Sequence, residues 1–136
     1  MNIAIVGIGL IGGSIGIRLK ETTLFDKIIG VEKSEANQKK ALQLGLVDEI
    51  QTLDQALKSC KVIVLTVPVD AIMVLLPKLL DIATDQVIID MGSTKSNILN
   101  LIKDHPNRGR YVAAHPMAGT EYSGPEAAIP NLFKIR

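Results

Sequence analysis

Residues 3–12 read Ile-Ala-Ile-Val-Gly-Ile-Gly-Leu-Ile-Gly, and this stretch decides the fold. Its first four residues form a short apolar run that is typical of a buried strand. Glycines at positions 7, 9 and 12 then follow the pattern G-x-G-x-x-G, and residues from about 10 to 21 are expected to form a helix. A strand, a glycine-rich turn and a helix in this order predict a site for the pyrophosphate of a dinucleotide.

Each glycine of this turn has its own predicted role. Gly7 allows the tight turn, Gly9 lets the backbone approach a pyrophosphate, and Gly12 lets the helix pack close to the strand. The helix N-terminus, with Leu10 and Ile11, supplies free N–H groups and the positive end of the helix dipole. A turn without any ligand is the alternative for the glycines alone. The strand before them, the helix after them and an acid about 20 residues on favour dinucleotide binding.

The same alternation of strands and helices continues along the chain. Further strands are expected at 27–32, 48–51, 62–67, 87–90 and 111–114, and further helices at 34–44, 52–59, from 70 onward and 94–104. Pro77 is expected to kink or split the helix that begins at 70. Continuous apolar strands separated by helices indicate a parallel sheet covered on both faces. The predicted fold class is therefore α/β, a doubly wound, mostly parallel sheet of the Rossmann type, forming one dinucleotide-binding domain over residues 1–136.

Such sheets bind ligands beyond the carboxyl ends of their strands. Glu32 ends the second strand, where its carboxylate can accept hydrogen bonds from the ribose hydroxyls and repel a 2′-phosphate. This predicts NAD rather than NADP as the cofactor, while the neighbouring cation Lys33 makes the choice less strict. The alternative for Glu32 is a solvated acid at a strand end.

Three later segments also follow strands and fall on the same edge. Thr66, Val67 and Pro68 close the fourth strand and are expected to form a wall beside the cofactor, with an ordinary turn as the alternative. Ser93 can cap the next helix, or its hydroxyl can lie beside the nicotinamide or a catalytic histidine. His115 directly follows the last strand, where an imidazole can exchange a proton with a substrate hydroxyl near neutral pH.

Composition excludes several classes of protein. The 136 residues carry 15 Lys and Arg against 14 Asp and Glu, and a net charge of +1 does not attract nucleic acid or an anionic membrane. Two Tyr, two Phe and no Trp leave no stacking platform for single strands. No apolar run reaches the roughly 18 residues of a membrane span. Residues 1–17 lack charge like a signal peptide, but no basic residue precedes them and five glycines interrupt them.

The cysteine and histidine residues predict no metal site. Cys60 is the single cysteine and cannot form an internal disulfide, which fits a reducing cytoplasm. Because Cys60 precedes an apolar strand, we expect an inert, packed thiol. His105 lies near a helix end and is expected to interact with the last carbonyls of that helix. Neither residue has the spacing of a metal-ligand set.

Four motifs occur in a fixed order along the chain. They are Gly7-x-Gly9-Leu10-Ile11-Gly12-Gly13-Ser14, then Thr66-x-Pro68, then Asp90-x-Gly92-Ser93-x-Lys95, and finally His115-Pro116-Met117-Ala118-Gly119-Thr120-Glu121 with Ser123-Gly124-Pro125. Together they resemble the prephenate dehydrogenase family, whose pattern arogenate dehydrogenases share. The first motif belongs to many dehydrogenases, and the fourth is far more specific.

The resemblance implies an NAD-dependent oxidative decarboxylation of prephenate or arogenate in tyrosine biosynthesis. It implies that His115 is the catalytic base and that Ser93 orients it near the nicotinamide. It also implies that Glu121, with Thr120 and Gly119, lies at the mouth of the substrate site. The family continues into a helical domain that forms a homodimer and supplies a further His and an Arg for the substrate carboxylate. The chain stops at Arg136, so we expect only the cofactor half here.

Two other functions are compatible with the cofactor fingerprint. A dehydrogenase of the β-hydroxyacid type shares the glycine motif but lacks the stretch from His115 to Glu121. A non-catalytic NAD-binding or redox-sensing module shares the fold, which cannot exclude it. The occurrence of both Ser93 and His115 on the cofactor edge favours an enzyme.

Overall fold

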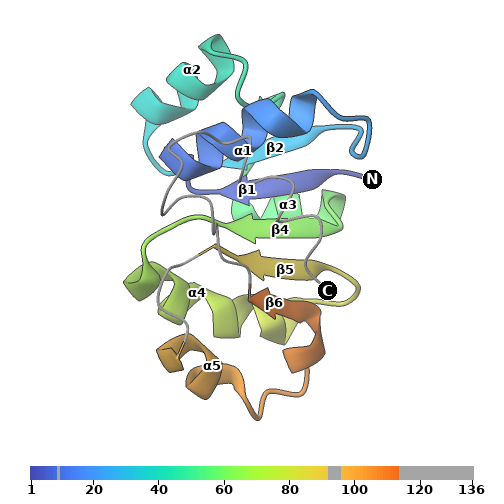
Figure 1. The fold of residues 1–136 in the computed structure, drawn as a ribbon, viewed down its shortest axis with the longest axis vertical. Helices are drawn as coiled ribbons and strands as arrows, with labels where there is room; N and C mark the ends of the chain where they lie inside the picture. The colour runs from blue at the N-terminus through green and yellow to red at the C-terminus, as the bar shows by residue number, and fades with distance from the viewer. Residues whose placement is uncertain (9, 92–95, 114–136) are drawn as a thin grey trace.

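A computed structural model of the chain describes residues 1–8, 10–91 and 96–113 (Figure 1). Its strands are β1 (Ile3–Val6), β2 (Ile28–Val31), β3 (Glu49–Ile50), β4 (Val62–Leu65), β5 (Val87–Asp90) and β6 (Tyr111–Ala113). Its helices are α1 (Leu10–Lys20), α2 (Glu35–Gln43), α3 (Leu53–Ser59), α4 (Val69–Ile82) and α5 (Ser96–Ile102), with a 3-10 turn over Arg108–Arg110.

The strands form one sheet in the order β3-β2-β1-β4-β5-β6. Every neighbouring pair is parallel. The strand order reverses between β1 and β4, which is the point at which doubly wound sheets bind their ligands. The predicted Rossmann-type fold is therefore confirmed.

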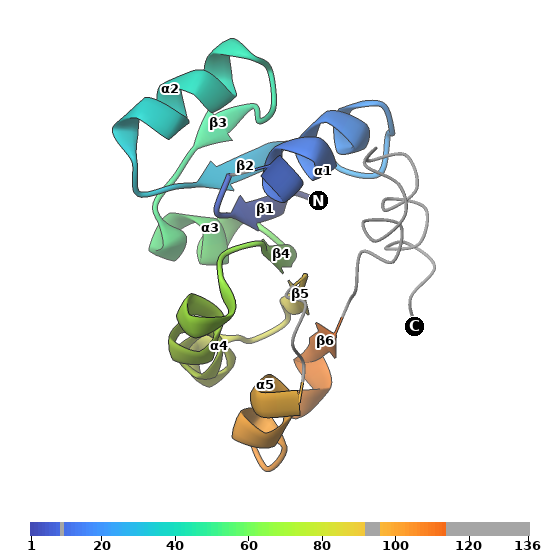
Figure 2. The ribbon, with the colours of Figure 1, turned by 60° about the vertical axis from the view of Figure 1, so that its left-hand side comes forward.

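Helices cover both faces of the sheet. Successive side chains of each strand point to opposite faces, so an apolar strand gives each face an apolar surface that a helix can bury. Ala4 and Val6 of β1 belong to the core on the side of α3, α4 and α5, whereas Ile3 and Ile5 belong to the core on the side of α1 and α2. Figure 2 shows α1 on the side of the sheet opposite α3 and α4. Apolar residues thus face a helix layer in both directions, as the continuous apolar strands predicted.

Short polar motifs fix the starts of two helices. The Ser34 hydroxyl accepts a hydrogen bond from the Asn37 N–H at 3.3 Å and caps α2. At α3, the Thr52 hydroxyl accepts from the Gln55 N–H, and the Gln55 side chain accepts from the Thr52 N–H in return. This is the predicted capping box.

Helix α4 differs from its prediction. Pro77 lies inside it, and the helix runs from Val69 to Ile82 without interruption, so of the predicted kink or split the split is wrong and the kink stays a prediction. Proline has no N–H to donate, and α4 lacks one backbone hydrogen bond there. Leu76 and Leu79, on either side of Pro77, are fully buried in the core, and their packing favours a continuous helix. Packing outweighs the local cost of the proline.

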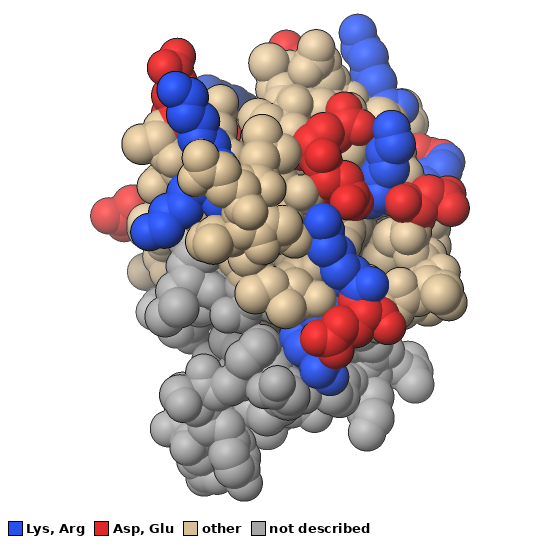
Figure 3. All heavy atoms as spheres, turned by 90° about the horizontal axis from the view of Figure 1, so that it is seen from above, with Lys and Arg blue, Asp and Glu red and all other residues tan. Residues whose placement is uncertain are grey.

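Charged side chains of both signs lie side by side on the face shown in Figure 3. Lys20 pairs with Asp48 and Lys27 pairs with Glu49, each at 3.1 Å. All four side chains are partly exposed, and exposed pairs contribute only about 0–1 kcal/mol each to stability. Such a mixture gives this face no strong field of one sign.

Within the described ranges, no helix combines the length and the hydropathy that a membrane crossing requires.

Helix α1 approaches the loop before β3 so closely that a side chain would not fit. A Cβ on Gly16 would collide with the carbonyl oxygen of Leu46. The obstacle is backbone, which cannot move aside as a flexible side chain can. Gly16 therefore sets the distance between α1 and this loop.

We predict that Gly16→Ala lowers the free energy of unfolding by about 1–3 kcal/mol, the range typical of overpacked sites. The measurement is urea denaturation followed by circular dichroism. Gly109→Ala is the matched control, because no atom lies within 4 Å of a Cβ built there. The control should change stability by less than about 0.5 kcal/mol. Equal midpoints for Gly16→Ala and the parent would show that the loop yields freely.

Candidate dinucleotide-binding site

A pocket of about 1120 Å³ opens at the carboxyl ends of β1, β2 and β4. Its volume lies slightly above the range of about 300–1,000 Å³ that is typical of ligand pockets. Its lining includes six of the predicted cofactor residues, namely Gly7, Glu32, Lys33, Thr66, Val67 and Pro68. Residues of three separate segments, each predicted from the sequence to bind the cofactor, therefore meet at one pocket.

Two glycines have the conformational roles that the sequence predicted. Gly7 has a φ of +88°, and a Cβ there would lie 2.6 Å from Cγ1 of Val67. A Cβ on Gly12 would collide with the Gly7 carbonyl oxygen and lie 2.9 Å from Oγ1 of Thr66. The turn and the first turn of α1 are thus packed backbone against backbone. Whether these glycines also contact a nucleotide stays a prediction.

Glu32 makes two hydrogen bonds that the sequence did not reveal. Its Oε1 accepts from the Ile8 N–H at 2.9 Å, and its Oε2 accepts from the Ser34 N–H at 3.1 Å. The Gln38 side-chain amide donates to the Glu32 carbonyl oxygen at 2.6 Å. The carboxylate therefore joins the glycine turn to the loop after β2, while it also lines the pocket.

Thr66 follows β4 and binds the same turn from the other side. Its hydroxyl donates to the Val6 carbonyl oxygen at 2.9 Å and also to the Gly7 carbonyl oxygen. The strand ends at Leu65, two residues earlier than predicted. Pro68 is the N-cap of α4, with φ of −58° and ψ of 154°, and it leads the chain from the strand into the helix.

One wall of the pocket is apolar, and no sequence motif predicted it. Ile50 and Leu53 line it from β3 and α3, and Ala71, Val74 and Leu75 line it from α4. Val74 is 63% exposed and presents its apolar side chain to the pocket. The one available signal was position, because Ile50 ends a strand at the ligand-binding edge. An apolar surface of this kind suits a flat aromatic ring such as a nucleobase.

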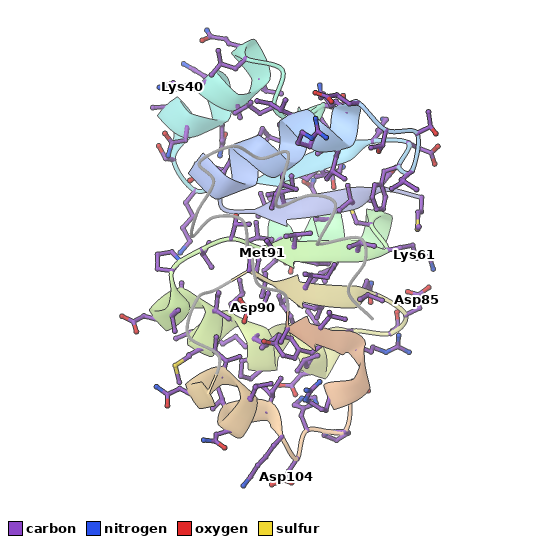
Figure 4. The ribbon with its side chains drawn as sticks, in the orientation of Figure 1. Lys40, Lys61, Asp85, Asp90, Met91 and Asp104 are labelled. Atoms are coloured by element: carbon purple, nitrogen blue, oxygen red, sulfur yellow. The ribbon has the colours of Figure 1, made fainter. Side chains whose placement is uncertain are left out.

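A buried acid at the end of β5 is hydrogen-bonded to a buried tyrosine at the start of β6. Asp90 is fully buried, Tyr111 is 3% exposed, and the tyrosine hydroxyl donates to Oδ2 of Asp90 at 2.8 Å. Figure 4 shows Asp90 and Met91 at the carboxyl end of β5, opposite the edge that carries Lys61 and Asp85. Burial, together with the hydrogen bond and charge of Asp90, raises the pKa of Tyr111.

Six predicted site residues lie outside the described part of the chain. They are Gly9, Ser93, His115, Gly119, Thr120 and Glu121. Leu10 and Ile11 begin α1 as expected, and their contacts with a cofactor stay a prediction. Across residues 1–8, 10–91 and 96–113, no cluster of three or more His, Cys, Asp or Glu side chains could hold a metal ion.

His105 and Cys60 lie away from the pocket. His105 Nε2 lies 2.6 Å from Oδ1 of Asp81, and its Nδ1 accepts from the Asn107 N–H at 3.0 Å. The expected contact with helix carbonyls is therefore wrong for the imidazole, because a carboxylate on α4 is within reach. Cys60 is buried as expected, and burial raises the pKa of its thiol.

Comparison with protein families gives the same assignment for most of the chain. The family of prephenate dehydrogenase nucleotide-binding domains matches residues 15–136. The chain belongs to this family.

Individual relatives agree with this prephenate dehydrogenase assignment. The prephenate dehydrogenase of Bacillus subtilis is 34% identical over 137 residues, which cover 98% of this chain and 37% of the relative. A crystal structure of the Aquifex aeolicus prephenate dehydrogenase with hydroxyphenyl propionate and NAD+ is 32% identical, with a TM-score of 0.76 over 93% of this chain and 45% of that one. Synechocystis arogenate dehydrogenase is 29% identical, with a TM-score of 0.69 over 85% of this chain and 41% of that one. The chain thus spans less than half the length of these relatives.

We predict that Tyr111→Phe lowers the free energy of unfolding by about 1–3 kcal/mol at pH 7, because Asp90 loses a buried donor. The raised pKa of Tyr111 in the folded state means that the unfolded chain ionises first above about pH 10, so the parent loses stability as pH rises from there. Tyr111→Phe cannot lose stability in this way. The difference in the free energy of unfolding between the parent and the variant should therefore become smaller toward pH 12. Urea titrations at pH 7, 10 and 11.5 measure it; a constant deficit would contradict the coupling.

Proposed function

We propose that this chain is the NAD-binding half of a dehydrogenase that converts prephenate to 4-hydroxyphenylpyruvate. The observation that supports it best is the pocket in which the glycine turn, Glu32 and the β4–α4 turn meet. The residues present fit a dinucleotide. Gly7 and Ile8, in the turn that leads into α1, line this pocket, so a pyrophosphate bound there would lie close to the N-terminus of a helix. The structure of the Aquifex aeolicus relative contains NAD+.

The position of Glu32 favours NAD over NADP. Each carboxylate oxygen accepts one backbone N–H and keeps a further lone pair for a ribose hydroxyl. The negative charge opposes a 2′-phosphate at the same place. Lys33 lines the pocket next to it and reduces this opposition.

The proposed chemistry divides between the cofactor and the protein. NAD, when bound, accepts the hydride from the ring carbon that carries the hydroxyl group. His115 takes the hydroxyl proton as the carbonyl forms, Ser93 orients the imidazole, and the ring carboxylate leaves as carbon dioxide. Gly119, Thr120 and Glu121 contact the substrate. The adjacency of β5 and β6 supports this arrangement, because the segments that contain Ser93 and His115 follow these neighbouring strands.

Arogenate is the alternative substrate, and the likeness to Synechocystis arogenate dehydrogenase favours testing it. The two substrates differ in a keto or an amino group on the side chain. For the complete enzyme we also propose a homodimer, on the family resemblance. We propose a cytoplasmic location, on the single cysteine of the chain.

We predict that this polypeptide binds NADH more tightly than NADPH, measured by the fluorescence of the reduced nucleotides. Glu32→Ala should raise the Kd of NADH about tenfold or more, since it removes ribose bonds. The Kd of NADPH should change by less than about threefold. The loss of the Glu32 contacts to the turn weakens NADPH binding, whereas the loss of its negative charge strengthens it. Glu35→Ala is the control, since Glu35 is exposed on the first turn of α2 and does not line the pocket. Equal losses for both nucleotides would remove the ribose role of Glu32.

We predict that His115→Asn, in an enzyme that contains both halves of the family's chain, lowers kcat for prephenate by about 100-fold or more. The Kd of NADH should be unchanged, because His115 acts on the substrate hydroxyl. Steady-state assays with prephenate and arogenate make the measurement and identify the substrate. Turnover near the parent rate would exclude the catalytic role. NADH binding without turnover of either substrate in the parent would favour a non-catalytic module.

A further inference from the structure

The hydroxyl of Thr66 is bound to the glycine turn. It donates to the carbonyl oxygens of Val6 and Gly7, and so it spans the last residue of β1 and the first residue of the turn. A Cβ on Gly12 would lie 2.9 Å from the same hydroxyl oxygen. The hydroxyl therefore lies between the turn and the first turn of α1.

We propose that Thr66 is a positioning residue for the pyrophosphate site. This inference rests on the proposed function, in which the dinucleotide phosphates bind at the N-terminus of α1. Thr66 lines the pocket, but its hydroxyl proton is used on backbone carbonyls, so the residue acts on the ligand through the turn. Its role is to fix the plane of the Gly7 peptide, and with it the place at which α1 begins.

The turn is held from both strands that flank β1. Glu32, after β2, accepts the Ile8 N–H, and Thr66, after β4, donates to the Gly7 carbonyl. One side chain thus holds an amide donor of the turn and the other holds a carbonyl acceptor. Gly7 has a φ of +88°, a conformation that glycine adopts readily. Because glycine is so flexible in the unfolded chain, fixing it there costs a large conformational entropy. Two side-chain hydrogen bonds restrict that freedom before any ligand binds.

A fixed turn should matter for phosphate and not for the adenosine end of a nucleotide. Phosphates bind to several N–H groups at a helix N-terminus, which must all point at one place. The nucleobase instead meets the apolar wall of Ile50, Leu53 and Val74, which belongs to other elements. A positioning role for Thr66 therefore separates ligands that contain the pyrophosphate from ligands that lack it.

The test compares NADH, ADP and adenosine on the parent, Thr66→Val and Thr66→Ser, by calorimetry or nucleotide fluorescence. Valine keeps the shape and removes the hydroxyl, and serine keeps the hydroxyl. For Thr66→Val we expect the Kd of NADH and ADP to rise about tenfold, which corresponds to about 1.4 kcal/mol. The Kd of adenosine should stay within about twofold, and Thr66→Ser should restore NADH and ADP binding to within about threefold of the parent.

Thr22→Val is the matched control. The Thr22 hydroxyl also donates to a backbone carbonyl, that of Leu19 at 2.9 Å, but at the far end of α1 and outside the pocket. It should bind all three ligands like the parent. If Thr66→Val does not fold by circular dichroism, Thr66→Ala replaces it with the same expectations.

Amide hydrogen exchange of the ligand-free chain supplies a second measurement that needs no nucleotide. Thr66→Val should speed exchange at the Ile8 amide, and Thr66→Ser should not. If the parent binds neither NADH nor ADP, the proposed function fails, and the exchange rate alone then decides whether Thr66 holds the turn. Parent-like ADP binding by Thr66→Val would overturn the inference. An equal loss of adenosine binding, or no rescue by serine, would overturn it as well, since either result indicates general loosening.

Discussion

The close crossing of backbone between β1 and α1 is the constraint on which the rest of the structure depends. Gly7 turns the chain with a positive φ, and Gly12 then passes against the Gly7 carbonyl with no room for a Cβ. This crossing brings α1 against the central strand, where Ile15 and Leu19 pack in one core with residues of β1. Because β1 pairs with both β2 and β4, the turn reaches side chains from either neighbour. Gly7 and Ile8 of this turn line the pocket together with residues that follow β2 and β4.

The fold was predictable because its signals are local. Apolar runs mark β1, β4 and β5, and the caps at Ser34 and Thr52 depend on residues three positions away. Errors arose where a distant contact outweighs a local preference. Thr66 is β-branched, which is typical of a strand, yet β4 ends at Leu65. The Thr66 hydroxyl instead binds the turn after β1. Pro77 reads as a helix break, yet the buried leucines around it keep α4 continuous.

The candidate site was predictable as a set of positions and not as a set of bonds. Residues that follow parallel strands meet at one edge, which places Gly7, Glu32 and Thr66 together from topology alone. Their hydrogen bonds depend on strand register. Val6 pairs with Val31 on one side and with Leu65 on the other, so the next residue of each strand reaches the turn. No spacing within one segment contains that information, and the apolar wall from α3 and α4 has the same origin.

Glu32 shows why nucleotide choice and nucleotide affinity are linked in this site. The carboxylate that we propose to oppose a 2′-phosphate also accepts the Ile8 N–H, so it holds the turn at which we propose that the pyrophosphate binds. Hydrogen bonds to a charged group contribute about 1.5–3 kcal/mol, more than neutral ones. A neutral residue in place of Glu32 therefore has two effects: it loosens the turn, and it removes the opposition to a 2′-phosphate. The hydroxyl of Thr66 carries no charge, so it orders the same turn without any preference between the two nucleotides. On the proposed function the two side chains have different roles: Thr66 sets the position of the turn, and Glu32 adds the selection against a 2′-phosphate.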